Sequence, residues 1–500
     1  MPPEAIQATS HLLAPDLHNS PGSSVFDLPI SSASPQYPQP TSRSRTPAPL
    51  VSGDQPIYTP EPDEPSFVII SGGTGCNAIC AAFTRACYVL PVSDDGGSSS
   101  EIIRVLGGPS IGDIRSRLVR LIPPAPPGSP LDRLRILLAH RLPASVSEQS
   151  ARDEWRAIVE GRSALWAGIP NDRKETIRGF LVYFESEVLR RAHKSFSFVN
   201  GSIGNYFLAA AQGFFRSLPS AIFLFSSITG SQANILPVIV TNHTVTIAAE
   251  LANGTHLVGQ CEISHPVSKP TLEFDDSVDN LAYSDGEEPP ESPDGDVGAT
   301  ISHSKNIMFS AEEKDEYEAL ESPITRLYYI NAYGHEIHPS PNPDYLASLN
   351  TNEMLVYSCG SLWTSIIPCL ALRGVASSIA RSQTLKAKIL FLNSKNDRET
   401  TGYTAEDYIN AITHTLNAHY NIKSYGISGA ETTYPISAFI THLVYLRGAA
   451  VSVDEQRVTK LGVRCIPVDG ELHDKDGVPM YDAACARRAI DDILKGGSDL

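Results

Sequence analysis

The sequence predicts an α/β fold with a doubly wound, mostly parallel sheet. Short apolar runs recur along the chain, and each leads through a glycine-rich or polar loop into a segment of helical character. The runs are 67–70, 88–92, 354–357 and 388–392. Parallel strands need crossover connections, which are usually helices, so this alternation favours a parallel sheet. We expect one such domain over residues 66–470, followed by a C-terminal segment, 471–500.

Composition separates this domain from two other stretches. Residues 1–65 hold 14 of the 38 prolines and show almost no apolar periodicity, so we expect a disordered tail. The stretch 271–321 holds sixteen Asp or Glu against two Lys, a net charge of −14, and predicts a disordered acidic insertion over about 269–321. The rest of the chain is then close to neutral although the total is −17. This balance argues against a broad nucleic-acid surface.

Periodicity predicts further elements. Residues 131–193 indicate several amphipathic helices, such as 176–191, and we expect a helical subdomain that covers the sheet edge. The runs 238–247 and 256–263, separated by a turn at 252–255, predict a hairpin. The segment 363–381 is expected to be mostly helix.

The sequence also bears on compartment. It contains no run of about 18 apolar residues and no basic flank before an apolar block, so we expect no membrane partner and no secretory signal. Eight cysteines without close spacing are typical of a reduced, cytoplasmic protein. Cys76 and Cys80 fall on the expected first helix, and we interpret them as buried thiols because no CxxC pair or His partner follows.

A glycine loop follows the first apolar run, as Gly72, Gly73, Thr74 and Gly75. A short strand that runs through glycines into a helix lets backbone N–H groups close on an anion at the positive end of that helix. The loop therefore predicts phosphate binding. The alternative is that the glycines only allow tight packing of the turn.

An acidic loop follows the second run, as Asp94 and Asp95, then Gly96, Gly97 and Ser98. Adjacent acids at a strand end can hold Mg²⁺ against a pyrophosphate or accept sugar hydroxyls. The same position suits the ribose acid of a nicotinamide oxidoreductase, although the first loop is GGTG rather than GxGxxG. A simple turn is a further alternative.

Other polar groups stand where elements begin. Asp113 and Arg115 add a third acid and a guanidinium able to grip phosphate, or are ordinary surface residues of a helix start. Asn205, in the pair Gly204–Asn205, is either a helix cap or a ligand amide. The remaining candidates for ligand contact are Gly360, Ser361 and Asn393.

Together these motifs resemble the CofD/YvcK family over residues 66 to about 415. The order is GGTG, DDGGSS, GDIRxxL, GSxGNxFLAA, ILPV with a hairpin, GSLxTSIIPxL, and an Asn followed by TGYTAEDY. The resemblance implies a Rossmann-like α/β fold. Its CofD branch moves a 2-phospholactyl group from a guanosine diphosphate donor to a deazaflavin acceptor, and its YvcK branch is similar to nucleotide-sugar-binding regulators of carbon use and cell-wall metabolism.

The wording of the motifs is closer to the YvcK branch, with three departures from the family. Gly201 replaces the His common before the Gly-Asn pair, Cys359 replaces a Pro, and Ser100 replaces a Gly. The first departure removes any acid/base role for that His. The tail and the acidic insertion lie outside the bacterial pattern and suggest a eukaryotic homologue.

The resemblance and the motifs lead to three functional hypotheses. The first is a protein that binds a nucleotide sugar or a nucleoside diphosphate derivative, with no covalently bound cofactor. The second is a transferase of the 2-phospho-L-lactate transferase type, in which Asp94 and Asp95 hold Mg²⁺ and serve catalysis. The third is an NAD(P)-dependent oxidoreductase. The sequence also leaves a homo-oligomer open.

Overall fold

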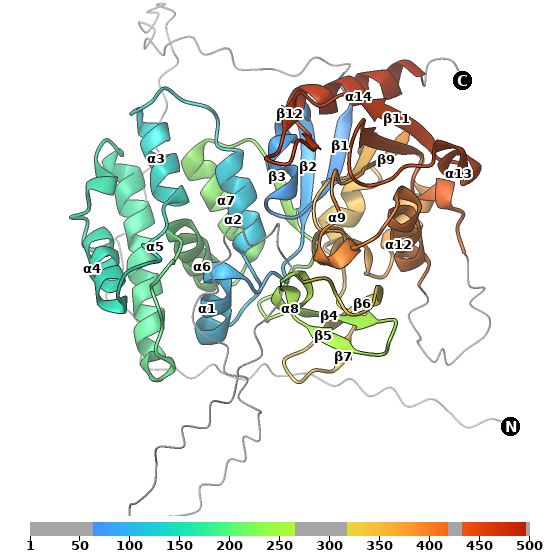
Figure 1. The fold of residues 1–500 in the computed structure, drawn as a ribbon. Helices are drawn as coiled ribbons and strands as arrows, with labels where there is room; N and C mark the ends of the chain where they lie inside the picture. The colour runs from blue at the N-terminus through green and yellow to red at the C-terminus, as the bar shows by residue number, and fades with distance from the viewer. Residues whose placement is uncertain (1–63, 266–317, 419–432, 497–500) are drawn as a thin grey trace, which may run out of the picture. The chain divides into compact units, whose positions relative to one another are not determined.

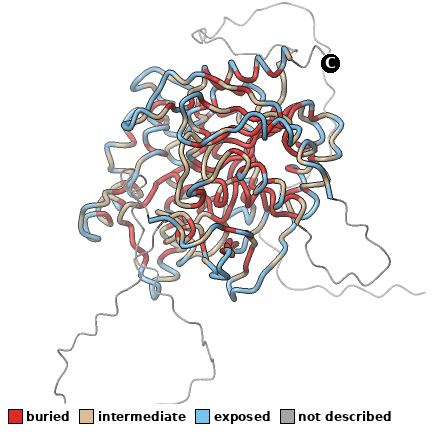
Figure 2. The backbone as a smooth tube through the Cα atoms, turned by 45° about the vertical axis from the view of Figure 1, so that its right-hand side comes forward, coloured by how far each residue is buried: buried red, intermediate tan, exposed pale blue. Residues whose placement is uncertain are grey.

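The structure is a computed structural model that describes residues 64–265, 318–418 and 433–496 (Figure 1). Nearly all of the expected tail and most of the expected acidic insertion lie outside the described residues, so both stay predictions. Within the described part, one hydrophobic core joins residues from Phe67 to Ile493. Figure 2 shows that the buried backbone runs through the middle of this core.

The central element is a seven-stranded sheet in the order β11-β10-β9-β8-β1-β2-β3, and every pair in it is parallel. This confirms the predicted fold class. The strands are β1 (Ser66–Ile70), β2 (Arg85–Leu90), β3 (Asn234–Pro237), β8 (Met354–Tyr357), β9 (Ala387–Phe391), β10 (His442–Leu446) and β11 (Arg464–Val468).

The middle strands are apolar because both faces of the sheet are covered. In β1, Ile69 pairs with Tyr88 on one side and with Val356 on the other, and all three side chains are buried. The order of the sheet is set by this strand, which lies between the second strand of the chain and the eighth.

Helices surround the sheet, and Figure 1 shows α3 to α7 to the left of the strands, α12 and α13 to their right, and α14 across their top. The left-hand group confirms the predicted helical subdomain and also includes α6 and α7. The helices are α1 (Gly97–Leu106), α2 (Gly112–Arg120), α3 (Pro130–Ala139), α4 (Glu148–Val159), α5 (Asn171–Arg190), α6 (Ile203–Phe215), α7 (Leu218–Thr229), α8 (Gln260–Ser264), α9 (Pro343–Ser348), α10 (Ile367–Leu370), α11 (Val375–Arg381), α12 (Ala405–Asn417), α13 (Glu455–Lys460) and α14 (Ala483–Gly496).

An aromatic cluster holds the helical subdomain together. The ring of Trp155 in α4 stacks on Phe198 at 5.3 Å and meets Tyr206 of α6 edge-on at 5.2 Å. Gly201 makes room for this cluster, because a Cβ there would collide with the Tyr206 hydroxyl.

A second, antiparallel sheet has the order β5-β4-β6-β7. Its strands are β4 (Thr246–Leu251), β5 (His256–Val258), β6 (Ile324–Ile330) and β7 (Glu336–Ile337). The predicted hairpin is present as β4 and β5, but both ends differ from the expectation. The N–H of Val238 donates to Leu90 beside the main sheet, and residues from Gln260 onward form α8.

The helix expected after the glycine loop is absent. Two short 3₁₀ turns, η1 (Gly75–Ala78) and η2 (Cys80–Ala82), stand in its place. The physical reason is length, because β2 already begins at Arg85 and leaves too few residues for a crossover helix. The interpretation of Cys76 and Cys80 as buried thiols is confirmed.

The segment 363–381 is helical but broken. A π-helical turn, η5 (Leu362–Ile366), leads into α10, and α11 starts only after Gly374, whose φ of 86° ends the previous turn. The described residues contain no single helix long and apolar enough to cross a membrane, although the bent pair Leu362–Leu370 and Val375–Arg381 meets that test by length and composition.

The remaining elements complete the edges. The C-terminal helix α14 packs on the core through Ala486 and Ile490, and Arg487 donates to the carbonyl of Ala82 at 3.0 Å. The other short elements are η3 (Ala164–Trp166), η4 (Ala192–Lys194), η6 (Arg398–Thr400), η7 (Ile436–Ala438), β12 (Leu472–His473) and β13 (Pro479–Met480).

The buried position of β1 yields a stability prediction. Ile69→Ala removes a fully buried side chain from the middle of the sheet and should lower the free energy of unfolding by about 2–5 kcal/mol. Ile136→Ala, at a side chain that is 42% exposed on α3, should change it by no more than about 0.5 kcal/mol. Urea denaturation of both variants checks this. Equal midpoints would contradict the placement of β1.

Candidate functional site

The loops that follow β1, β8 and β9 meet at one edge of the main sheet. Asn393, after β9, accepts the Gly360 N–H at 2.8 Å and donates to the Gly360 carbonyl at 2.8 Å. The Cys359 thiol in turn reaches the Gly75 carbonyl at 3.5 Å. This is the edge where open parallel sheets hold ligands. The Asn393 amide is used here to fix the Gly360 loop.

The glycine loop is packed against its neighbours too closely for side chains. A Cβ on Gly73 would lie 2.8 Å from Cα of Asp113, and a Cβ on Gly75 would lie 2.8 Å from Cα of Gly360. The tight-packing alternative therefore accounts for these two glycines. A phosphate contact by the loop stays a prediction, and it has no helix N-terminus behind it because η1 and η2 replace that helix.

Arg117 lies beneath this loop and was missed by the sequence analysis. Its Nη2 donates to the Gly72 carbonyl at 3.1 Å and to the Ser71 hydroxyl at 3.3 Å, and its guanidinium lies 4.9 Å from the Tyr88 ring centroid. Its Nε and Nη1 are buried and make no hydrogen bond in the described part of the chain. A fixed positive charge thus stands behind the glycine loop. The sequence did contain a signal for Arg117, because it is the second arginine of the GDIRSR motif. It follows Arg115 by two residues, and in a helix this spacing places the two side chains on different sides.

Arg115 is buried, with 9% of its surface exposed, whereas an exposed position was expected. Its Nε donates to Asn205 Oδ1 at 2.9 Å, and Asn205 Nδ2 donates to the Ser98 hydroxyl at 2.7 Å. Gly204 lies against this side chain and has no room for one of its own, because a Cβ there would lie 2.4 Å from the Leu138 carbonyl oxygen and 3.1 Å from Arg115. Burial, followed by the nearby charge of Arg141, lowers the pKa of Arg115 to about 10.

The hydrogen bonds of Arg115 leave part of its guanidinium available. Among the described residues, only the Nε group has a hydrogen-bond partner, so the two terminal amino groups can serve a ligand. The helix-cap interpretation of Asn205 is wrong, because Ser202 caps α6. Asn205 instead positions Arg115.

The two adjacent acids point to different partners. Asp94 Oδ1 accepts the Gly96 N–H at 3.0 Å, whereas Asp95 Oδ1 accepts the Cys261 N–H of α8 at 2.8 Å. Desolvation, then the negative charges of Asp113 and Asp95, raise the pKa of Asp94 to about 8. Asp94 therefore has Asp113 as its electrostatic neighbour, and Asp95 ties the loop to the small sheet.

These carboxylates meet part of the requirement for a metal. No group of three or more His, Cys, Asp or Glu within the described ranges is arranged to hold an ion. Mg²⁺, however, is usually held by one or two carboxylates together with substrate phosphates. A cation beside Asp94 would relieve the repulsion from Asp113 that raises the Asp94 pKa. Asp94 therefore fits a metal that arrives with a phosphorylated ligand.

Arg141 and Glu399 also lie at this edge of the sheet, and no sequence motif had indicated either of them. Arg141 donates to the Asn200 carbonyl at 3.3 Å, and its charge acts on both Asp94 and Arg115. Glu399 accepts the N–H groups of Trp363 at 2.9 Å and Thr364 at 3.1 Å, which fixes the start of η5.

A second buried acid accompanies Glu399. Burial and the neighbouring Asp397 raise the pKa of Glu399 to about 8. Burial likewise raises the pKa of Asp397, and hydrogen bonds, the Thr400 hydroxyl first and Ser361 among the others, lower it. Ser361 thus stands beside an acidic pair rather than beside a cation.

The Asp94 shift predicts a pH-dependent stability. Because the pKa of Asp94 is raised from 3.8 to about 8, its contribution to stability is complete below about pH 4 and is lost as pH rises through about 8. Asp94→Asn cannot ionise. It should therefore exceed the parent in free energy of unfolding above about pH 8, by on the order of 1 kcal/mol or more, and the difference should shrink toward about pH 4.

Thermal melting of the ligand-free protein across this pH range measures the effect. The exposed Asp172→Asn on α5 serves as the control and should follow the parent. Parallel curves for Asp94→Asn and the parent would show that Asp94 is not desolvated.

Comparison with known proteins identifies the family to which this chain is similar. The family model of 2-phospho-L-lactate transferase CofD matches residues 67–470. The uncharacterized protein YNL011C of Saccharomyces cerevisiae is 35% identical in an alignment 430 residues long, which covers 80% of this chain and 94% of that protein. The gluconeogenesis factor of Halalkalibacterium halodurans is 27% identical over 150 residues, 30% of this chain and 45% of that protein.

A solved structure supports the same fold. The crystal structure of a UPF0052 family protein from Bacillus halodurans superposes with a TM-score of 0.53 at 18% identity, and covers 85% of this chain and 99% of that one. The resemblance stated from the motifs is confirmed. The length of the family match and the likeness to the yeast protein show that this chain belongs to the CofD family.

Proposed function

We propose that this chain binds a nucleotide sugar or another nucleoside diphosphate derivative at the sheet edge around Asp94 and Arg115. The observation that carries the proposal is Arg115: a buried guanidinium, positioned by Asn205, whose terminal amino groups have no hydrogen-bond partner among the described residues. Such a group grips a phosphate through two charge-assisted hydrogen bonds.

The charges around Arg115 favour a diphosphate over a single carboxylate. Arg141 adds a positive charge close enough to act on Arg115, and Arg117 adds one beneath the glycine loop. Asp94 adds a carboxylate suited to a metal that accompanies the phosphates. A nicotinamide dinucleotide is less favoured, since the glycine loop lacks the helix whose N-terminus would hold the pyrophosphate. The motif wording nearer the YvcK branch supports a binding role.

Transfer of a phosphate-linked group is the second candidate. The family model that matches the chain describes a 2-phospho-L-lactate transferase, and the second carboxylate of Asp113 close to Asp94 is the specific observation that favours a metal there. In that case Arg115 would hold the diphosphate, and Asp94 would hold Mg²⁺, which neutralises charge on the phosphates. Asp95 would act by fixing the loop through Cys261.

Native mass spectrometry of the purified protein, with identification of any nucleotide released on denaturation, tests the proposed ligand class. Calorimetry with GDP, a UDP-sugar and NAD then ranks the ligands. Binding of a diphosphate compound supports the proposal. Tight NAD binding without a response to the diphosphates would overturn it in favour of the oxidoreductase.

Substitution at Arg115 should weaken ligand binding without loss of the fold. Arg115→Lys keeps the charge but loses the Nε bond to Asn205 and the forked geometry, so affinity should fall about ten- to a hundredfold. Arg120→Ala on the same helix, where the exposed side chain donates to Asn77, is the matched control and should bind as the parent does. Unchanged affinity of Arg115→Lys, with normal melting, would remove Arg115 from the site.

The two acids should separate binding from transfer. With a phosphodiester-linked donor and Mg²⁺, Asp94→Asn should abolish turnover and leave ligand affinity within about tenfold, because an amide keeps a hydrogen bond but cannot neutralise the metal. Asp95→Asn should retain turnover, since an amide oxygen can still accept the Cys261 N–H. If the parent protein binds its ligand without metal and shows no turnover with the acceptors tested, the transferase hypothesis is wrong and only the binding role remains.

A further inference from the structure

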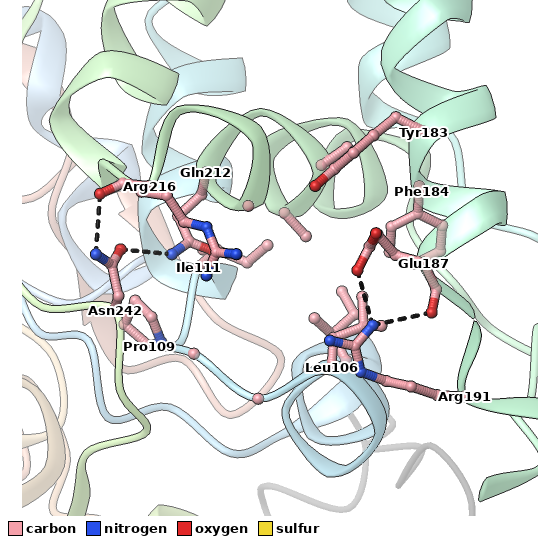
Figure 3. Close-up of a pocket in the computed structure, with 16 residues that line it drawn as sticks. Leu106, Pro109, Ile111, Tyr183, Phe184, Glu187, Arg191, Gln212, Arg216 and Asn242 are labelled. Atoms are coloured by element: carbon pink, nitrogen blue, oxygen red, sulfur yellow. Dashed lines mark hydrogen bonds and ion pairs between the residues drawn. The ribbon is translucent and has the colours of Figure 1, made fainter. Parts of the chain in front are cut away.

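A pocket whose lining includes neither Asp94 nor Arg115 lies between α1, α5 and α6 (Figure 3). The loop that joins α1 to α2 closes one side of it. The lining is mixed, and its apolar part is formed by Ile102, Leu106, Ile111, Phe184, Ala209 and Ala210. A small hydrophobic group fits such a surface.

Charged and polar groups stand at the rim of this pocket. Arg191 forms an ion pair with Glu187 at 2.8 Å, so these two charges compensate each other. Arg216, at the end of α6, makes no side-chain hydrogen bond or ion pair within the described ranges, and Figure 3 shows its guanidinium at the pocket. In the same view the Tyr183 hydroxyl points toward the centre of the pocket. The lining therefore carries one uncompensated positive charge.

The wall beside Arg216 is already fixed by hydrogen bonds. Gln212 donates to Asn242 Oδ1 at 3.0 Å, and Asn242 donates to the Arg216 carbonyl at 2.9 Å. Arg216 adopts a left-handed backbone with φ of 53°, which a non-glycine residue adopts only at some energetic cost. The opposite loop reaches Gln212 through Gly108, whose φ is 92°. The pocket is thus formed before any ligand enters.

We propose that this pocket is a second binding site, and that its ligand is a small organic anion with an apolar portion. Arg216 would hold the anionic group, and the apolar wall of α1 and α6 would take the hydrocarbon portion. A charge-assisted bond to a guanidinium contributes more than a neutral one, and burial of each CH₂ group adds to the affinity, so both parts of the ligand are needed for appreciable affinity.

The pocket lies on the same helix faces as the Asn205–Ser98 hydrogen bond. Ile102 follows Ser98 by one turn of α1, and Ala209 follows Asn205 by one turn of α6. Four residues of helix span about 6 Å, so the pocket begins one turn from the bond that positions Arg115. Occupancy of the pocket does not depend on the function proposed above.

Binding of butyrate tests the site directly, with the full chain and saturation-transfer NMR. Butyrate should give a signal with the parent, whereas butyramide, its neutral counterpart, should bind more weakly. Arg216→Gln should weaken butyrate by about tenfold or more, because it removes the charge and keeps most of the side chain. Arg162→Gln, which loses an equal charge at an exposed ion pair with Glu160, should bind butyrate as the parent does.

A pocket-filling variant provides the second arm. Gly213→Leu places a side chain in a helical position where a Cβ meets only Tyr183, at 3.8 Å, so the helix should persist while the pocket is filled. It should abolish the butyrate signal. Equal butyrate binding by Arg216→Gln and the parent, or no binding by the parent, would overturn the proposal. Inorganic phosphate that binds as tightly as butyrate would show that the apolar portion is not needed, and would overturn that part.

Discussion

The site depends on how closely the backbone at Gly73 approaches the start of α2. The Cα of Asp113 lies so near that no side chain fits between them, and Ser116 of the same helix donates to the Gly73 carbonyl at 3.0 Å. Arg117 holds the neighbouring Gly72 carbonyl from below. With α2 fixed against β1 in this way, Arg115 can leave the helix only toward α6.

This constraint explains why a buried guanidinium is tolerated. An unpaired buried charge is costly, but Arg115 has a hydrogen bond to Asn205 and lies near the carboxylate of Asp94. The pKa of Asp94 is in turn raised, because the carboxyl is desolvated and because Asp113 lies near it. The charges of Arg115, Asp94 and Asp113 are only partly compensated by one another. A bound phosphate would further stabilise Arg115, and a cation would further stabilise the two acids. The proposed binding and transfer functions use this same balance and differ only in whether a bond is broken.

The helices α1 and α6 connect this edge to the rest of the helical subdomain. Ser98 and Asn205 join their first turns, and later turns of both helices line the pocket. The aromatic cluster around Trp155 anchors α6 from the other side through Tyr206. The position of Arg115 is therefore set by helix packing as well as by the sheet, which gives the subdomain a role beyond covering the edge.

The sequence by itself determined the sheet, the family and the loops at its edge. Apolar runs such as 354–357 must be buried wherever they lie, and the GGTG and DDGGSS loops follow them directly. Periodicity could not determine what occupies the short segment after Gly75, because a crossover of that length is settled by the distance between β1 and β2. Periodicity likewise could not show that the side chains of Asp94 and Asp95 have different hydrogen-bond partners. Only tertiary structure decided which groups share a space: Arg115 with Asn205, Asp94 with Asp113, and Arg117 beneath the glycine loop, because these pairs are far apart in the chain or leave a helix on opposite sides.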